Sequence, residues 1–434
     1  MDINPFTFGN PIRDPARFYG REAELRQIVS RLLSSAHEST SIVGERRIGK
    51  TSLLLHLSES GVAGRLGLVP DRFCLIYIDF QGLTDITPHR FWQRVLRKMS
   101  RSICQPELLP EITALEARDS IDLFDLEDLC EAISASGLTV VLLLDEFEYI
   151  TQNPNFSPDF FGGLRALAIH HDLPLVTATR RELVDLCHSD EIKGSPFFNI
   201  FANVVLRPFD PDQASGMVDG YLVKTGLEFS DREKELLHSL GGGHPFFIQI
   251  AGYYLIEAKE RGFTGDQLIH RVISDFEGQA DPHFQYLWTH CTESEKISLL
   301  AVIALSRQKP SKKSLPSVEN LAQVYPRARL DVPELLKRGL LVAHPEMEGC
   351  CQVLSSSLER WIGVEISASS ESEETQTTAD EWLRSGGGEL VEPVRHALPR
   401  FKKKYWPLIG TIMKELSFEL AGAATYEFLI KMLV

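Results

Sequence analysis

A glycine-rich run that ends in lysine and threonine is the first part of this sequence with recognisable chemistry. Residues 44–51 are GERRIGKT and fit the pattern GxxxxGK[ST]. Glycines at this spacing let backbone N–H groups point at phosphate oxygens, and Lys50 places a cation on the same oxygens. The hydroxyl of Thr51 can ligate Mg²⁺. The run therefore predicts a P-loop that binds a nucleotide together with magnesium.

The flanking sequence supports this interpretation over a lysine-containing turn without a ligand. An apolar segment at residues 40–44 precedes the run, and a helical segment at residues 51–57 follows it. A phosphate-binding loop needs this order of strand, loop and helix, because the helix presents its positive dipole end to the phosphates. The predicted nucleotide-binding residues of the loop are Gly44, Glu45, Arg46, Arg47, Ile48, Gly49, Lys50, Thr51 and Ser52.

A pair of carboxylates follows a buried apolar run further along the chain. Residues 140–146 are VVLLLDE. We expect Asp145 to hold Mg²⁺ through water and Glu146 to polarise the attacking water as general base. Lys50 and Glu146 are predicted catalytic residues. The alternative is a strand that ends in an acidic cap, without hydrolysis.

Hydroxyl and arginine side chains end the next apolar run, LVTATRR at residues 175–181. If this strand neighbours the one that ends in Asp145, Thr179 could reach the terminal phosphate or the attacking water. Arg180 or Arg181 could then sense the phosphate charge. The alternative is a surface arginine pair after an ordinary strand.

Alternating strands and helices must position these groups. Apolar strands are predicted at residues 40–44, 74–80, 139–145, 173–179 and 203–206, with helices at residues 21–35, 88–103 and 120–134. Nearly continuous apolar strands between helices are typical of a parallel sheet covered on both faces. The predicted fold class is therefore α/β, with a nucleotide-binding sheet sandwiched by helices.

The rest of the chain predicts further parts of different character. Residues 1–20 form a lead-in to the core at 21–211, which is followed by a helical lid at 212–285. Helices and a hairpin (residues 339–344 with 351–354) at 286–365 have the outline of a winged helix. Residues 366–388 have the composition of a flexible linker, and residues 389–434 predict an amphipathic helical module.

The overall composition restricts the function. A net charge of −15 gives no general attraction to nucleic-acid phosphates. The N-terminal residues lack the pattern of a signal peptide, and no apolar run reaches the roughly 18 residues of a membrane-spanning helix. The seven cysteines form no metal-binding pattern, so we expect free buried thiols in a cytoplasmic protein.

Several of these segments together resemble STAND NTPases and their origin-recognition-type relatives in the AAA+ superfamily. The similar segments are FYGRE at 18–22, GERRIGKTSLL at 44–54, VVLLLDEFE at 140–148, VTATRRE at 176–182 and GGHP at 242–245. The resemblance covers about residues 16–365. It implies an ATPase that binds ATP or ADP with Mg²⁺ and cleaves the β–γ phosphoanhydride bond.

The resemblance also implies residue roles. Phe18, Tyr19, Gly20 and Arg21 would lie against the adenine and ribose, and Pro245 would close over the base from the lid. Arg180 would report the γ-phosphate, and the winged helix would lock the ADP state. The sequence departs from the family in two respects. Residues 353–358, which correspond to a Met-His-Asp motif, contain no histidine, and no arginine finger for ring assembly is recognisable.

Three functions fit these features. The first is a signal-transduction switch that changes conformation or self-associates when ATP replaces ADP, and that acts on a partner protein through its C-terminal module. The resemblance favours prokaryotic conflict or defence signalling. The second is a DNA-handling AAA+ ATPase, a loader or transposition helper that uses the winged helix, which the acidic charge opposes. The third is a scaffold that keeps ATP as a structural ligand.

Overall fold

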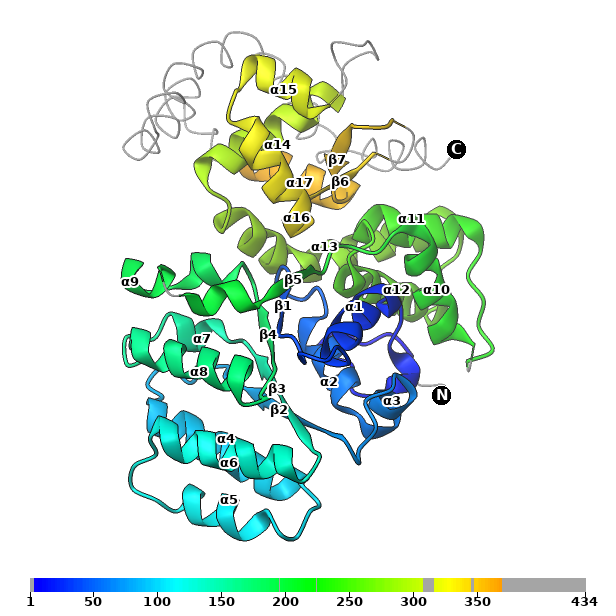
Figure 1. Cartoon of the computed structure of the whole chain (residues 1–434). Coiled ribbons are helices and arrows are strands. Elements are labelled where there is room, and N and C mark those ends of the chain that lie inside the picture. Colours follow the sequence, from blue (N-terminus) through cyan, green and yellow to red (C-terminus); the bar gives the residue numbers. More distant parts are fainter. Residues whose placement is uncertain (1–3, 195, 224, 307–315, 345–346, 369–434) are drawn as a thin grey trace. The chain divides into compact units, whose positions relative to one another are not determined.

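A computed structural model describes residues 4–194, 196–223, 225–306, 316–344 and 347–368 (Figure 1). The chain divides into two compact units. The sheet unit is Asn10–Leu206, and the helical unit comprises residues 1–9 and 207–434. The predicted linker lies almost entirely outside the described residues, and the predicted C-terminal module lies entirely outside them.

The sheet unit contains five parallel strands in the order β2-β3-β4-β1-β5. The strands are β1 (Thr40–Val43), β2 (Phe73–Asp79), β3 (Thr139–Asp145), β4 (Leu175–Thr179) and β5 (Ala202–Val205). The longer helices are α1 (Glu22–Leu32), α2 (Lys50–Ser58), α4 (Pro88–Ser102), α5 (Leu109–Glu116), α6 (Leu123–Ala135) and α8 (Pro158–His170). Short helices complete the unit: η1 (Pro15–Arg17), α3 (Ser60–Arg65), α7 (Glu148–Thr151), η2 (Leu183–Leu186), α9 (Asp190–Lys193) and η3 (Pro196–Ile200). The parallel sheet predicted from the apolar runs is confirmed.

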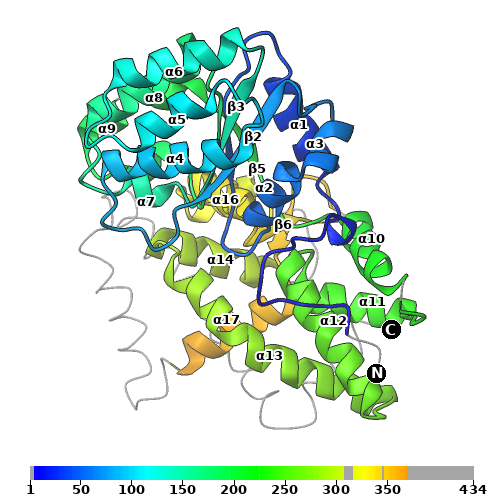
Figure 2. The same cartoon turned by 90° about the horizontal axis from the view of Figure 1, so that it is seen from below.

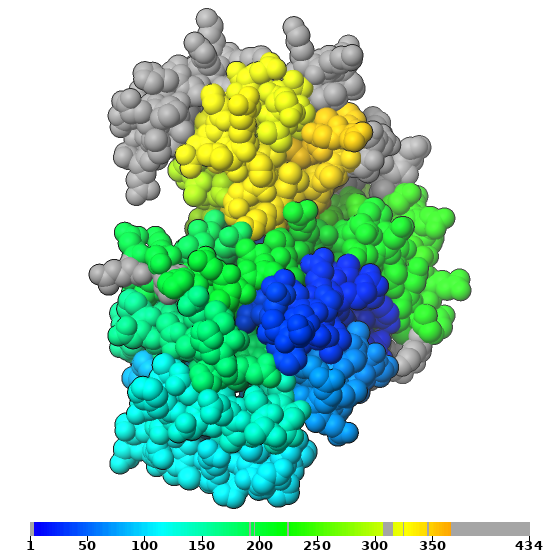
Figure 3. Space-filling model, in the orientation of Figure 1, coloured from blue at the N-terminus to red at the C-terminus, as the bar shows by residue number. Residues whose placement is uncertain are grey.

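Helices cover both faces of this sheet, as the two views show (Figures 1 and 2). Strand β3 is buried along its whole length because its side chains alternate between two cores. Val140, Leu142 and Leu144 join the core that contains residues of α4, α5, α6 and α8. Val141 and Leu143 join the core that contains residues of α1, α2 and α3. In the space-filling view, the segments around α1 and α3 and around α5 reach the surface (Figure 3).

The sheet brings the predicted site residues to one edge. In a parallel sheet all carboxyl ends of the strands lie on the same side, so the residues after β1, β3 and β4 meet there. Val43 at the end of β1 is in register with Thr179, and Asp79 at the end of β2 is in register with Asp145. Strand β4 lies between β1 and β3.

The helical unit is built mainly from helices. They are α10 (Pro211–Leu222), α11 (Asp231–Gly241), α12 (Pro245–Glu260), α13 (Gly265–Thr289), α14 (Glu293–Ser306), α15 (Val318–Val324), α16 (Ala328–Arg338) and α17 (Ser356–Ala368). Two strands, β6 (Leu341–Ala343) and β7 (Cys351–Val353), form the predicted antiparallel hairpin. The assignment of residues 286–365 to a winged helix stays a prediction.

Two glycines allow a close approach of chain segments within the helical unit. Gly242 and Gly243 have φ of 58° and 82°, in the left-handed region that favours glycine. A Cβ on Gly242 would come within 1.7 Å of the Leu354 carbonyl oxygen, and one on Gly243 within 2.3 Å of the Phe209 oxygen. The packing of the helical unit therefore requires glycine at both positions of the GGHP segment, independently of any contact with a nucleotide.

The first described residues pack into the helical unit. Phe6 is fully buried, with its ring 5.4 Å from that of Tyr221 and 5.9 Å from that of Phe229. A Cβ on Gly252 would lie 2.6 Å from the Phe6 ring. Part of the predicted lead-in is thus packed against the helical unit, and its assignment as a lead-in stays a prediction.

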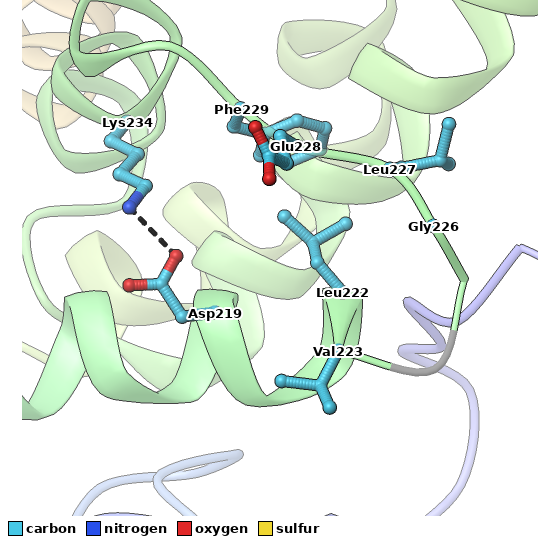
Figure 4. A pocket seen from close by; sticks show the side chains of 8 residues that line it. All are labelled: Asp219, Leu222, Val223, Gly226, Leu227, Glu228, Phe229 and Lys234. Carbon is cyan, nitrogen blue, oxygen red and sulfur yellow. Dashed lines mark ion pairs between the residues drawn. The ribbon is translucent and has the colours of Figure 1, made fainter.

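A shallow pocket also belongs to the helical unit (Figure 4). Leu222, Val223 and Phe229 supply apolar lining, and Asp219 and Lys234 form an ion pair of 2.7 Å at its side. None of the residues predicted to bind nucleotide lines this pocket.

All seven cysteines are free, but the prediction that they are buried was wrong in part. Four are buried, whereas Cys104 is exposed and Cys74 and Cys187 are half-buried. Across the described ranges, no helix is long and apolar enough to cross a membrane.

Candidate functional site

The loop between β1 and α2 has a backbone that only glycine permits at two points. Gly44 donates its N–H to the Thr179 carbonyl at 3.2 Å, and a Cβ on it would lie 2.8 Å from Ile48 Cγ2. Gly49 has φ of 106° and directly precedes α2. Arg47 also has positive φ, 68°, although it is not glycine. The GxxxxGK pattern is therefore required by the loop's shape.

Lys50 lies against this loop and is 5% exposed. Its Nζ donates to the carbonyl oxygens of Gly44 at 2.9 Å and Glu45 at 3.2 Å. The N-cap of α2 is Gly49, which offers no side chain to the N–H groups of the first turn. A helix N-terminus of this kind attracts anions, and the buried ammonium adds a positive charge. The residues fit a bound phosphate.

Asp145 and Thr51 meet, although 94 residues separate them in the sequence. Asp145 is 1% exposed, and the Thr51 hydroxyl lies close to its side chain. Burial raises the pKa of Asp145, and the bonds from Thr51 and Tyr77 oppose that rise. A hydroxyl and a carboxylate are ligands that Mg²⁺ prefers.

This donor set is small, which suits magnesium. Among the residues that the structure describes, no three His, Cys, Asp or Glu side chains are grouped so that they could hold a metal. Mg²⁺ is usually bound by one or two carboxylates together with substrate phosphates and water. Thr51 and Asp145 therefore fit a magnesium ion that arrives with a nucleotide.

The carboxylate of Asp145 is held by two further donors. Tyr77 on β2 donates its hydroxyl to Asp145 Oδ2 at 2.9 Å, and the Glu146 N–H donates to Oδ1 at 3.0 Å. The sequence analysis missed Tyr77. The sequence did offer one signal for it, because Tyr77 carries a hydroxyl and lies two residues before the carboxyl end of the partly buried strand β2.

Glu146 occupies a strained backbone position beside this group. Its φ is 52°, in the left-handed region, where a residue with a side chain is strained. Strained backbone positions of this kind cluster at functional sites. Burial raises the pKa of Glu146 to about 7, the nearby charge of Glu148 adds to the rise, and Lys50 opposes it. The side chain is half-buried.

Arg180 pairs with a glutamate that the sequence analysis missed. Its Nε lies 2.9 Å from Glu148 Oε1, and the side chains are 34% and 2% exposed respectively. The hydroxyl of the neighbouring Thr179 donates to the Arg181 carbonyl at 2.7 Å. Thr179 was predicted to reach phosphate or water, and that contact stays a prediction.

The segment predicted to contact adenine and ribose makes contacts of its own. The Phe18 ring stacks on His56, with centroids 4.1 Å apart, and the Tyr19 hydroxyl donates to Ala16 O. Arg21 is 4% exposed and donates to the P-loop carbonyl of Ile48 at 3.2 Å. Gly20 precedes it with φ of 76°. This segment is thus fixed to the phosphate loop.

The side chains of the remaining predicted residues make contacts of their own or are exposed. Glu45 accepts a hydrogen bond from the N–H of Arg46, and the side chains of Arg46 and Arg47 are exposed. Ser52 accepts a bond from the N–H of Ile12 at 3.0 Å. Pro245 is the first residue of α12, in the helical unit. Its predicted contact with the base stays a prediction.

A parallel sheet with a P-loop after β1, a buried aspartate at the end of β3 and an arginine after β4 defines a P-loop NTPase of the AAA+ and STAND class. Residues 27–308 match the family model described as Novel STAND NTPase 2. The chain belongs to this family.

Similar solved structures include a Walker-type ATPase of Pyrococcus abyssi, with 18% identity and a TM-score of 0.53 over 82% of this chain and 98% of that chain. The ORC2 protein of Aeropyrum pernix, in ADPNP–ADP complexes, has 14% identity and a TM-score of 0.49 over 84% and 99%. The Pyrococcus structure shows the fold. No curated protein matched the sequence.

Proposed function

We propose that this protein is an ATP-binding and slowly ATP-hydrolysing switch that changes conformation or self-associates when ATP replaces ADP. The observation that carries the proposal is the contact between Thr51 and Asp145 beside the P-loop of Lys50, in a chain of the STAND NTPase family. The match to a STAND NTPase family model supports a nucleotide as the ligand.

Each residue at the sheet edge has a role in this proposal. Lys50 and the loop's N–H groups hold the phosphates, while Thr51 and Asp145 hold Mg²⁺, which when bound neutralises phosphate charge. Glu146 orients the attacking water and accepts its proton. Arg180 stabilises the charge that develops on the γ-phosphate.

The switch depends on a difference in affinity. A nucleotide shifts a conformational equilibrium only if it binds the two conformers unequally. In the proposal, Pro245 and the region 286–365 favour the ADP-bound conformer, and the γ-phosphate of ATP favours the other. The setting we infer is prokaryotic conflict or defence signalling through a partner protein. The net charge of −15 gives a DNA-handling role less support.

The test is the nucleotide that co-purifies with the protein and the rate of ATP turnover. We expect wild type to carry ADP and to turn over slowly. Lys50→Ala should lose the nucleotide, and Glu146→Gln should accumulate ATP. If Glu146→Gln hydrolyses ATP like wild type, the assigned base is wrong. If wild type binds nucleotide but does not hydrolyse it, the scaffold function replaces the switch, and if it binds no nucleotide the proposed function fails.

A further inference from the structure

A buried glutamate outside the predicted machinery holds the predicted γ-phosphate arginine. Glu148 is 1% exposed, and its Oε1 lies 2.9 Å from Arg180 Nε. Its other oxygen, Oε2, is buried and has no hydrogen-bond partner among the described residues. Arg180 is therefore the described cation on which this carboxylate depends.

The position of Glu148 is fixed by the segment that carries it. Phe147 is fully buried and donates its N–H to the Ala178 carbonyl of β4 at 3.1 Å. Thr151, at the end of α7, donates its hydroxyl to the Leu186 carbonyl at 3.0 Å and accepts a bond from the His188 N–H. The segment that carries Glu148 is thus packed and is hydrogen-bonded to β4, the strand that precedes Arg180.

The geometry of the pair favours retention of the contact when a phosphate arrives. Removing the cation would leave a buried carboxylate unpaired, which is strongly unfavourable. Arginine has five N–H donors on a rigid planar group, and the contact with Glu148 uses Nε. One guanidinium can therefore serve Glu148 on its Nε side and a phosphate oxygen at its terminal nitrogens.

We propose that Glu148 is a positioning residue that orients Arg180 toward the γ-phosphate of ATP. This inference rests on the proposed function. Because the ion pair is formed between two side chains of the protein itself, the arginine is ordered in advance and less conformational entropy is lost on binding. ADP has no γ-phosphate, so Glu148 contributes to the distinction between ATP and ADP without touching either.

The experiment measures the dissociation constants of ADP and of a non-hydrolysable ATP analogue, both with Mg²⁺. The variants are Glu148→Gln, Arg180→Ala and the double variant, with Glu111→Gln on exposed α5 as the matched control. We expect Glu148→Gln to weaken analogue binding about tenfold and to leave ADP binding unchanged. The double variant should bind the analogue no more weakly than Arg180→Ala alone, since both changes remove one interaction.

Glu148→Asp keeps the charge and tests the same point if the glutamine variant does not fold. It should restore part of the preference for the ATP analogue. Three results would overturn the inference: tighter analogue binding by Glu148→Gln, equal weakening of ADP and analogue, or an undiminished effect of Glu148→Gln in the Arg180→Ala background. Failure of the proposed function has a different signature, because wild type would then bind neither nucleotide.

Discussion

The Tyr77 hydroxyl donates a hydrogen bond to Asp145 Oδ2 at 2.9 Å, across two neighbouring strands. Tyr77 faces Leu143 in the register, so its side chain must extend along the sheet to reach the strand end. The predicted magnesium-binding carboxylate is thereby held from β2 as well as from the backbone of Glu146.

Tyr77→Phe should weaken the response to magnesium. The substitution keeps the ring and removes the donor, so Asp145 is less well oriented. Outer partners of metal ligands typically contribute about tenfold in affinity or activity. A magnesium titration of ATP turnover should show a correspondingly higher half-activating concentration. Tyr149→Phe, on α7, is the control, and equal titration curves for wild type and Tyr77→Phe would contradict the role.

Gly44→Ala should abolish the binding of both nucleotides. The new Cβ would lie 2.8 Å from Ile48 Cγ2 and 3.1 Å from the Leu206 carbonyl oxygen, so the loop would have to shift. Calorimetric titration with ATP analogue and ADP measures the loss. Gly64→Ala is the matched control, because Gly64 is in α3 and a Cβ there meets nothing within 4 Å. Normal binding by Gly44→Ala would show that the loop tolerates the side chain.

Arg21→Met should destabilise the sheet unit and weaken ATP and ADP equally. The substitution removes the ion pair of the buried Arg21 with Glu24 and its hydrogen bond to the Ile48 carbonyl. Breaking a buried pair on one side typically costs about 3 kcal/mol. Urea unfolding gives the loss in free energy, with the exposed Arg26→Met as reference. A loss of ATP binding alone would instead support a direct contact of Arg21 with the nucleotide's terminal phosphate.

His56 should make stability depend on pH. Burial and the nearby charge of Arg65 lower the pKa of His56 below its usual 6.5, and its Nδ1 is buried without a hydrogen-bond partner in the described part of the chain. The unfolded chain thus binds the proton more tightly than the folded one. The contribution of neutral His56 to stability is present above pH 6.5 and is lost as pH falls from there through the folded-state pKa.

Chemical denaturation at about pH 8 and about pH 5 measures this effect. His56→Phe retains a ring against Phe18 and should show a smaller loss of stability between the two conditions than wild type. His170→Phe, at an exposed position, should behave like wild type. An unchanged loss in His56→Phe would assign the pH dependence to other groups.

The sequence predicted those residues whose positions follow from the order of strands, loops and helices along the chain. Lys50, Thr51 and Asp145 come together because strand, loop and helix alternate, and because a parallel sheet collects the ends of its strands at one edge. The contacts of Glu148 and Tyr77 could not be predicted in this way. Their partners come from other strands, and no local spacing shows which side chains will meet across the sheet.

Arg21 shows the same limit from another side. Its place in the FYGRE segment suggested a nucleotide contact, which stays a prediction, and the buried bond to the Ile48 carbonyl was not foreseen. Phe6 looked like part of an extended lead-in because its neighbours are proline, asparagine and glycine. Its burial depends on Tyr221 and Phe229, more than 200 residues away.

The end of strand β4 is hydrogen-bonded both to the P-loop and to the turn that follows β3. Gly44 donates to the carbonyl of Thr179, and Phe147 donates to that of Ala178. The separation between the phosphate loop and the turn that carries Glu146 is therefore fixed through the end of one strand. A substitution that only loosens the packing of Val176, which is fully buried, would change that separation. In the proposed function, we accordingly expect ATP turnover to respond to substitutions in the core of β4 as well as to substitutions in the predicted site.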